Sequence, residues 1–278
     1  MMRFCIILGA MKAGTTSLFN YLAQHPEIAP CKEKEPSFFS HHYKKGLNWY
    51  LSLWKGENTE NKILLEASTN YTKFPSFPKS SGNIADFSNK HDVSIKFIYV
   101  MRNPIKRIES QYTYAYARWT DQPLEDRIHP DGHLVNVSRY AQQLDRYYDN
   151  FEPGCFLLLD FDDLANDPRT LLCEICQFIG VDADFQFSNI GDVHNKSKGS
   201  IITRPVERLY KKYPLLESFS NLFPKSFKRF LSTILLRQRI AGKFKLTDIQ
   251  KQRVNEALND DMARLQKQYG IDVKKWGF

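Results

Sequence analysis

The chain has 278 residues and a formal net charge of +8, and its 42% hydrophobic and 25% charged residues are ordinary for a soluble globular protein. It is long enough for a full hydrophobic core. No apolar stretch approaches the roughly 20 residues that cross a bilayer, so we expect no transmembrane segment.

The charge is unevenly distributed. Residues 196–278 hold 19 of the 39 Lys and Arg but only 7 of the 31 Asp and Glu, a local net charge of +12, whereas residues 1–195 carry −4. Such a basic end is typical of a chain with an anionic partner, and equally of a solvated helical surface. Because the basic residues are not interleaved with a recognisable RNA or DNA module, we expect no nucleic-acid partner.

Four short apolar runs predict buried parallel strands, at residues 3–9, 62–67, 95–101 and 155–161. We interpret the first run as a buried strand and not as a removable signal peptide, because it is too short and flows directly into a motif. Between the strands lie helical patterns. Strands that alternate with helices predict an α/β fold, with a central parallel sheet and helices on both faces.

The predicted helices have recognisable starts and apolar faces. Leu18, Tyr21 and Leu22 share a face after the first strand, Pro104 occupies a favoured first-turn position, and residues 168–180 carry an apolar stripe. In such folds ligands bind beyond the carboxyl ends of the strands. We therefore look for functional residues where the predicted strands end.

The remaining segments are less regular. Residues 117–136 are polar and broken by Pro and Gly, which predicts a long loop, and residues 186–205 lack periodicity. Basic helices are expected beyond them, the last of which starts with a capping box from Thr247 to Gln250. That last helix has an apolar stripe made of Val254, Leu258, Met262, Leu265 and Tyr269.

The five cysteines are scattered along the chain. Cys173 and Cys176 form a C-x-x-C pattern, but they lie in an apolar helical segment without a second pair, which favours packed thiols over a metal or redox site. A reducing, cytoplasmic setting is the plain interpretation.

The segment "LGAMKAGTTSL" (8–18) is a glycine-rich turn between a strand and a helix. Outward-pointing backbone N–H groups and the helix dipole make such a turn a phosphate cradle. Gly9 and Gly14 have the spacing of the P-loop, G-x-x-x-x-G-K-[ST]. However, Thr15 stands at the lysine position, and Lys12 comes two residues before Gly14. This displacement weakens the reading as a metal-dependent ATPase or a P-loop small-molecule kinase with ATP and Mg²⁺, which stays an alternative.

The segment "GAMKAGTTSL" resembles the 5′-phosphosulfate loop of sulfotransferases that use 3′-phosphoadenosine 5′-phosphosulfate (PAPS), whose loop carries a lysine at the position of Lys12. The resemblance implies a P-loop-like fold, PAPS as co-substrate, no metal, and Lys12 as a catalytic and donor-binding residue. The donor-binding set that it implies in this turn is Lys12, Ala13, Gly14, Thr15, Thr16 and Ser17.

A second motif, "RNPIKRIESQY", follows the strand at 95–101. It resembles the family's R-[DN]-P…R…S-x-Y motif, which implies that Arg102 and Ser110 hold the 3′-phosphate of PAPS. The later segment "HNKSKGS" resembles a loop that closes over the nucleotide, which implies that Lys198 and Gly199 also bind it. By the same resemblance, Asp162 and Asp163 belong to a turn and helix start and not to a metal pair.

The acceptor side depends on "CKEKEPSFFS" (31–40). A positioned base eases transfer to a hydroxyl, because it removes the proton as the new bond forms. In the heparan sulfate branch of the family, that base is a glutamate before a Phe-Phe pair, which implies that Glu35 is the catalytic base. A solvated charge run is the plain alternative, and His41 or His42 is the fallback base because an imidazole titrates near neutral pH.

The resemblance covers residues 3 to about 200, with the heparan branch closest, and the basic helical segment 201–278 lies beyond it. We expect a single domain, 1–278, whose catalytic core is 1–200. Heparan-type enzymes carry a lysine near their acceptor where this chain has Ala67, and their disulfide near the late loop has no counterpart here. These departures predict a neutral or cationic small molecule, such as a natural-product precursor, in preference to a polyanionic glycan.

Several questions stay open at this level. A non-catalytic protein that binds a nucleotide or a glycan is a second alternative to the sulfotransferase. The sequence does not show whether the acceptor group is a hydroxyl or an amine, and it does not show the oligomeric state. The acceptor pocket is expected to include four aromatic residues, Tyr112, Tyr114, Tyr116 and Trp119.

Overall fold

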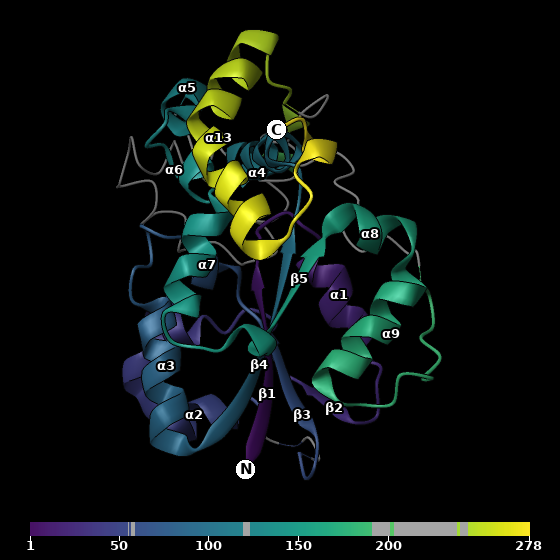
Figure 1. Ribbon diagram of the computed structural model, residues 1–278. Helices are drawn as coiled ribbons and strands as arrows, with labels where there is room; N and C mark the ends of the chain where they lie inside the picture. Colours follow the sequence, from purple (N-terminus) through teal and green to yellow (C-terminus); the bar gives the residue numbers. More distant parts are fainter. Residues whose placement is uncertain (55, 57–58, 119–122, 191–200, 203–237, 240–243) are drawn as a thin grey trace, which may run out of the picture.

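The computed structural model describes residues 1–54, 56, 59–118, 123–190, 201–202, 238–239 and 244–278. Its centre is a five-stranded parallel sheet in the order β2-β3-β1-β4-β5 (Figure 1). The strands are β1 (Met2–Gly9), β2 (Ile28–Pro30), β3 (Ile63–Ala67), β4 (Val93–Met101) and β5 (Phe156–Asp160). The parallel sheet flanked by helices that the sequence predicts is therefore confirmed.

All four predicted strands are present, and each is mostly apolar because helices cover both faces of the sheet. In β1, every residue from Phe4 to Gly9 is buried. The strand β2 was not predicted, because three residues at a sheet edge are too short to give a pattern. It pairs with β3 from Ile28↔Ile63 to Pro30↔Leu65.

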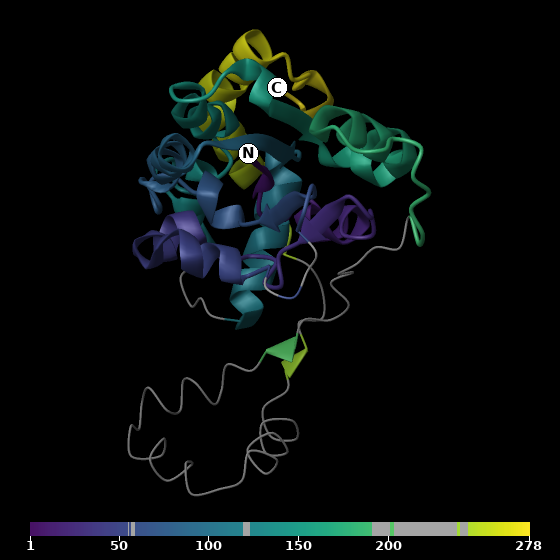
Figure 2. The same cartoon turned by 90° about the horizontal axis from the view of Figure 1, so that it is seen from below.

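The helices form two layers. In Figures 1 and 2, α1, α8 and α9 lie on one side of the sheet, and α2, α3 and α7 lie on the other. The α-helices up to α9 are α1 (Thr15–Leu22), α2 (Gly46–Ser52), α3 (Ser80–His91), α4 (Pro104–Arg118), α5 (Leu124–Ile128), α6 (His133–Asn136), α7 (Tyr140–Tyr148), α8 (Phe161–Asn166) and α9 (Pro168–Ile179). The short turns are a π-helix η1 (Phe38–His42) and the 3₁₀ turns η2 (Tyr43–Lys45), η3 (Thr69–Thr72) and η4 (Pro153–Cys155).

The order of the strands locates the place where ligands bind in such sheets. The chain leaves β1 toward β2 and β3 on one side and returns to add β4 and β5 on the other. The carboxyl end of β1 is therefore the point at which the strand order reverses, and ligands of open α/β sheets bind at such a point. The predicted phosphate cradle follows β1 directly.

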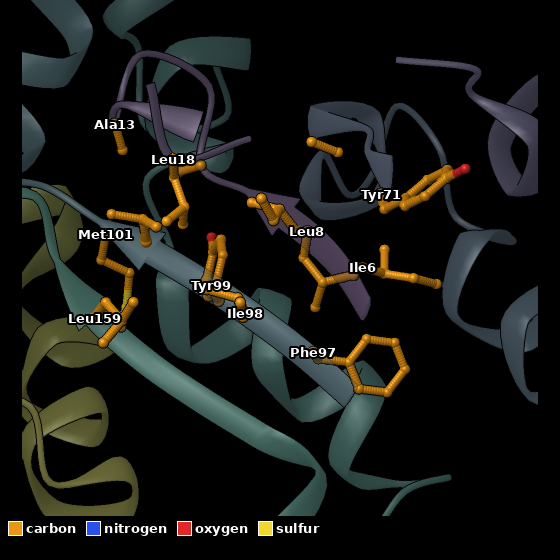
Figure 3. Packing of buried hydrophobic residues seen from close by; sticks show 14 of the residues in the cluster. Ile6, Leu8, Ala13, Leu18, Tyr71, Phe97, Ile98, Tyr99, Met101 and Leu159 are labelled. Atoms are coloured by element: carbon orange, nitrogen blue, oxygen red, sulfur yellow. The ribbon is translucent and has the colours of Figure 1, made fainter. Parts of the chain in front are cut away.

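The core lies between the sheet and its two helical layers. Figure 3 shows Ile6 and Leu8 of β1 beside Phe97 and Ile98 of β4, and Leu18 of α1 lies near Met101 at the end of β4. Leu18 and Leu22 are fully buried and Tyr21 nearly so, as the helical spacing predicts. This packing fixes the end of β1 relative to α1.

The prediction of a long loop over residues 117–136 is wrong. The helix α4 continues to Arg118, and α5 and α6 follow, with residues 119–122 outside the described part. Both helices are too short to give a periodic pattern, and tertiary contacts hold them. The guanidinium of Arg107, which is fully buried, donates from Nη2 to the Leu134 carbonyl at 2.6 Å and from Nε to Ser138 Oγ at 3.0 Å.

The predicted final helix is α13 (Asp248–Tyr269), which begins with the predicted capping box at Thr247 and Gln250. Its buried stripe packs against the body of the fold, and the Asp261 carboxylate accepts the N–H groups of Ala141 and Gln142 at the start of α7. The 3₁₀ turn η5 (Lys274–Trp276) follows. The predicted basic helices over 203–237 lie outside the described residues.

Two further strands, β6 (Ile201–Ile202) and β7 (Gln238–Arg239), form a small antiparallel ladder. Among the described helices, none is long and apolar enough to span a membrane.

Candidate active site

The predicted phosphate cradle begins at Gly14, the residue that caps the start of α1. The first N–H groups of a helix have no acceptor within the helix, so those at the start of α1 point toward the end of the sheet. The N–H of Ala13 is used inside the turn, where it donates to the Ala10 carbonyl at 3.1 Å. Ala13, whose side chain is fully buried, thus shapes the turn, and the amides of residues 14–17 are the ones placed for an anion.

Gly14 is required at its position for two reasons. Its φ of +84° lies in the left-handed region that other residues avoid. A β-carbon there would come within 3.0 Å of side-chain atoms of Phe161 and Leu164, which belong to α8. Because the residue has no side chain, α8 packs closely against the cradle. Thr15 is buried, and Thr16 and Ser17 are half-buried.

Lys12 stands at the outer edge of the turn with a backbone φ of +73°. Its ammonium lies 4.5 Å from the centre of the Tyr114 ring, on α4. A cation over an aromatic face is attracted by the ring's electrons, so Tyr114 holds the ammonium beside the cradle. Tyr114 is thus one of the four predicted pocket aromatics that the structure brings to this site.

Arg102 follows β4, the neighbour of β1, and its side chain reaches the same turn. Its Nη1 donates to the carbonyl oxygen of Lys12 at 2.9 Å, and its guanidinium stacks 4.4 Å from the centre of the Phe161 ring. The Tyr140 hydroxyl donates to the Arg102 carbonyl at 2.7 Å, which fixes the backbone at the end of β4.

The guanidinium of Arg102 still has a free donor within the described part of the chain. Its Nε is buried and has no hydrogen-bond acceptor there. Burial also lowers the pKa of Arg102. A buried N–H without an acceptor is costly, and an anion that accepts from it would remove the cost. The arginine therefore fits a phosphate ligand.

Ser110, the other predicted phosphate ligand, is half-buried on α4, one turn before Tyr114. Residues four apart lie on one helix face, so Ser110 shares the face that meets Lys12. Lys198 and Gly199 lie outside the described residues. Asp162 and Asp163 occupy the first turn of α8 behind the cap residue Asp160, as predicted.

Glu35, the predicted base, lies on the segment after β2. Its Oε1 accepts from Lys34 Nζ at 2.9 Å, and its Oε2 accepts from the Thr69 hydroxyl at 3.2 Å. Lys34 Nζ also lies 3.5 Å from Thr15 Oγ1 in the cradle. Because 42% of the Glu35 side chain is exposed, it is accessible while it is held beside the start of α1.

The fallback bases have other neighbours. The His41 ring packs against Phe77 and its Nδ1 lies 2.9 Å from Ser40 Oγ, whereas His42 packs against Trp49. None of these contacts involves Thr15 or Thr69. Among the predicted aromatics, Tyr112 and Tyr116 pack on Phe244. Trp119 lies outside the described residues.

Two charged residues near Glu35 are not predicted as site residues from the sequence. Lys73 has an exposed fraction of 9%, and its Nζ donates to Asn70 Oδ1 at 2.7 Å. Burial lowers the pKa of Lys73 to about 8, and the charge of Glu35 acts in the opposite direction. Glu66, on β3, is fully buried. The signal was present, because a glutamate inside the apolar run 62–67 demands hydrogen-bond partners.

The chain is similar in sequence to known proteins. A family model described as "Sulfotransferase domain" matches residues 3–264. The chain is 28% identical over 186 residues to heparan sulfate glucosamine 3-O-sulfotransferase 3A1 of Mus musculus, covering 63% of this chain and 45% of that protein. It is 26% identical over 205 residues to bifunctional heparan sulfate N-deacetylase/N-sulfotransferase 4 of Mus musculus, covering 66% of this chain and 23% of that protein. The chain thus spans less than half the length of these two relatives.

Among solved structures, a sulfotransferase from Alicyclobacillus acidocaldarius superposes with a TM-score of 0.68 at 20% identity, and the match covers 99% of this chain and 98% of that one. At this identity the superposition establishes a shared fold. Together with the family model, which spans most of the sequence, it settles the classification: the chain belongs to the sulfotransferase domain family.

Proposed function

We propose that this chain transfers the sulfuryl group of PAPS to a hydroxyl or an amine of a small-molecule or glycan acceptor and releases adenosine 3′,5′-bisphosphate. The observation that carries the proposal is that the cradle contacts both of the other predicted site segments. Arg102 bonds the carbonyl of Lys12, and Lys34 joins Glu35 to Thr15. Three stretches distant in sequence thus converge at the carboxyl ends of β1, β3 and β4.

The residues present fit PAPS. The 5′-phosphosulfate would lie over the amides of residues 14–17, where the helix dipole favours an anion. Arg102 and Ser110 would hold the 3′-phosphate, for which the unpaired Nε of Arg102 is the supporting observation. Lys198 and Gly199 are proposed to close over the nucleotide, on the strength of the sequence resemblance alone.

Glu35 and Lys12 have separate roles in the proposed sulfuryl transfer. Glu35 takes the proton from the acceptor hydroxyl as the acceptor oxygen forms its bond to sulfur. The bond between sulfur and the phosphate oxygen of the donor breaks in line, and its electron pair stays on that oxygen. Lys12 neutralises the charge that develops there, and fixed donors of this kind are often the largest single catalytic contribution. The residues supply both the proton acceptor and the counter-charge, so the proposal includes no metal.

The acceptor class is narrowed by charge. The methyl group of Ala67 is fully buried, and its N–H donates to the Lys34 carbonyl at 3.0 Å. This chain therefore has no cationic side chain at the position where heparan-type enzymes carry a lysine. Lys34 and Lys73 nevertheless place two ammonium groups around Glu35, which disfavours the cationic acceptor considered from the sequence. We propose a neutral alcohol, such as a natural-product precursor.

We also propose that residues 1–278 act as one domain in the cytoplasm. The contacts of Asp261 with the start of α7 support the single domain. All five cysteines are free thiols, which supports a reducing setting.

The test is incubation of the full chain with PAPS and pooled acceptors, followed by mass spectrometry for the mass gain of one sulfonate. The pools contain neutral alcohols, amines and heparan oligosaccharides, and a parallel reaction with ATP and Mg²⁺ tests for phosphoryl transfer. We expect sulfonation of a neutral alcohol. Preference for heparan oligosaccharides would contradict the proposed neutral acceptor. Binding of PAPS without any turnover would contradict the proposed sulfotransferase activity.

A further inference from the structure

A buried carboxylate lies behind the loop that carries Glu35. Glu66 is on β3, the strand beside β1, and three hydroxyl groups donate to it. The Tyr50 hydroxyl donates to Oε1 at 2.8 Å, the Tyr71 hydroxyl to Oε1 at 3.0 Å, and the Ser68 hydroxyl to Oε2 at 2.8 Å. All four residues are buried, and the Tyr71 oxygen is also within 3.3 Å of Oε2.

Two of these hydroxyls reach onward to the loop. The Ser68 oxygen accepts the backbone N–H of Ser37 at 3.0 Å, and the Tyr71 oxygen accepts the backbone N–H of Phe39 at 3.3 Å. The two amides lie two and four residues after Glu35. By contrast, the Tyr50 hydroxyl donates to Glu66 and, among the described residues, makes no hydrogen bond to the loop, although the Tyr50 ring packs on those of Phe38 and Phe39.

The direction of each hydroxyl proton decides whether the loop is held. A hydroxyl has one proton to donate and two lone pairs that accept. When the proton of Ser68 or Tyr71 points at the carboxylate, the lone pairs of that oxygen are left for a backbone N–H. Once Glu66 is ionised, its carboxylate offers only acceptors and enforces this orientation on both residues at once.

We infer that Glu66 is a positioning residue for the sulfuryl transfer. It orients the hydroxyls of Ser68 and Tyr71 so that they fix the backbone after Glu35 and keep the Glu35 side chain where Lys34 links it to Thr15. The inference rests on the proposed function, in which Glu35 is the base. Nothing in it requires Glu66 to contact the donor or the acceptor.

Other charged and titratable groups face this carboxylate from the surrounding elements. They are Glu35, Cys31, Tyr50, Tyr71 and Tyr147. Tyr147 Oη donates to the Tyr71 carbonyl at 2.8 Å, so it braces the turn η3 from α7. The direct hydrogen bonds to Glu66 come from the three hydroxyls described above.

The test compares variants that differ only in polar atoms. Glu66→Gln keeps the side-chain shape but replaces one acceptor oxygen by an N–H donor, which forces one hydroxyl to turn its proton away. Ser68→Ala removes one link to the loop and leaves the carboxylate in place. Tyr50→Phe is the matched control, because it removes a hydroxyl from the same carboxylate without removing a link to the loop.

Three quantities are measured on each folded variant: kcat for sulfonation, the dissociation constant of adenosine 3′,5′-bisphosphate by calorimetry, and hydrogen exchange of the Ser37 and Phe39 amides. We expect Glu66→Gln and Ser68→Ala to lower kcat about tenfold, since one net hydrogen bond is worth about that factor. Nucleotide affinity should stay within about twofold, because the cradle and Arg102 are untouched. Exchange of the Ser37 amide should accelerate in both variants, and Tyr50→Phe should leave all three quantities close to wild type.

Two results would overturn the inference. The first is a kcat for Ser68→Ala and Glu66→Gln that stays within about twofold of wild type. The second is an equal loss in Tyr50→Phe, which would make the effect one of general packing. A wild-type protein that binds the nucleotide but transfers nothing would instead contradict the proposed function, and amide exchange would still report whether Glu66 holds the loop.

Discussion

The donor side and the acceptor side of the site are built in different ways. On the donor side, Lys12, Gly14 and Arg102 follow directly from β1 and β4, which are neighbouring strands, and close contacts with α8 lock the turn. On the acceptor side, Glu35 lies on a loop that side-chain hydrogen bonds attach to the end of β3. The backbone of the sheet places the donor residues, whereas a network of hydroxyls places the base. Substitutions should therefore affect the two sides differently.

The largest effect is expected at Lys12, on the donor side. Lys12→Ala should lower kcat about 10²- to 10³-fold, or about 3–4 kcal/mol, because the charge on the departing oxygen loses its counter-charge. Donor affinity should change far less, since the cradle amides remain. Steady-state kinetics and calorimetry check this split. The control is Lys44→Ala, which changes an exposed lysine in the turn η2. Near-normal turnover of Lys12→Ala would contradict the catalytic role of Lys12.

The buried carboxylate separates activity from stability. Burial raises the pKa of Glu66 from 4.5 to about 7. Between these values the folded state holds a proton that the unfolded state has lost, so the contribution of Glu66 to stability falls as the pH rises through this window.

Glu66→Gln lacks this titration. Relative to wild type, the variant should therefore gain about 2–3 kcal/mol in free energy of unfolding between about pH 4.5 and about pH 8. Urea unfolding at both pH values measures the difference. If Glu66→Gln gains stability at high pH while it loses turnover, Glu66 serves to position the loop and not to stabilise the fold. A difference in free energy of unfolding that does not change with pH would contradict the raised pKa of Glu66.

On the donor side, Arg102→Ala should erase recognition of the 3′-phosphate. Hydrogen bonds to a charged group are worth about 1.5–3 kcal/mol, so the dissociation constant of adenosine 3′,5′-bisphosphate should rise about ten- to hundredfold. The affinity for adenosine 5′-monophosphate, which lacks that phosphate, should barely change. Lys106→Ala, whose ammonium lies 3.8 Å from Asp162 on the surface, is the matched control. A wild-type protein that binds both nucleotides equally would refute the donor assignment.

The smallest effect is expected from a single tether of the acceptor side. Thr69→Val removes the hydroxyl that donates to Glu35 and keeps the branched shape. Because Glu35 is partly exposed, we expect a fall in kcat of about three- to tenfold and unchanged nucleotide affinity. Thr59→Val, at an exposed site, serves as the reference. A larger effect on nucleotide affinity than on kcat would place Thr69 on the donor side instead.

The contrast between the two sides also explains what the sequence predicts and what it does not. Four strands, the cradle, the position of Arg102 and the capping box at Thr247 follow from local patterns, because each is encoded within about ten consecutive residues. The edge strand β2 and the helices α5 and α6 do not, since tertiary contacts such as those of Arg107 stabilise segments too short to be periodic.

The surroundings of Glu35 belong to the second group. The loop is held by Ser68 and Tyr71, which lie 31 and 32 residues from the amides that they accept, and no local spacing predicts that pairing. Lys73 and Glu66 were missed for the same reason. A charged residue in an apolar strand does signal a buried network, but the identity of its partners comes only from the three-dimensional structure.

The residues that hold Asp160 and Arg102 in place lie far along the sequence, at Lys275 and Trp276. The Asp160 carboxylate accepts from Trp276 Nε1 at 2.9 Å and pairs with Lys275 at 2.8 Å, and the Trp276 ring packs on Tyr140, which holds the Arg102 carbonyl. During synthesis Arg102 leaves the ribosome long before Trp276. A nascent chain that already carries every donor motif therefore lacks these contacts until Lys275 and Trp276 have also been made. A fragment that ends at residue 200 would also lack these contacts.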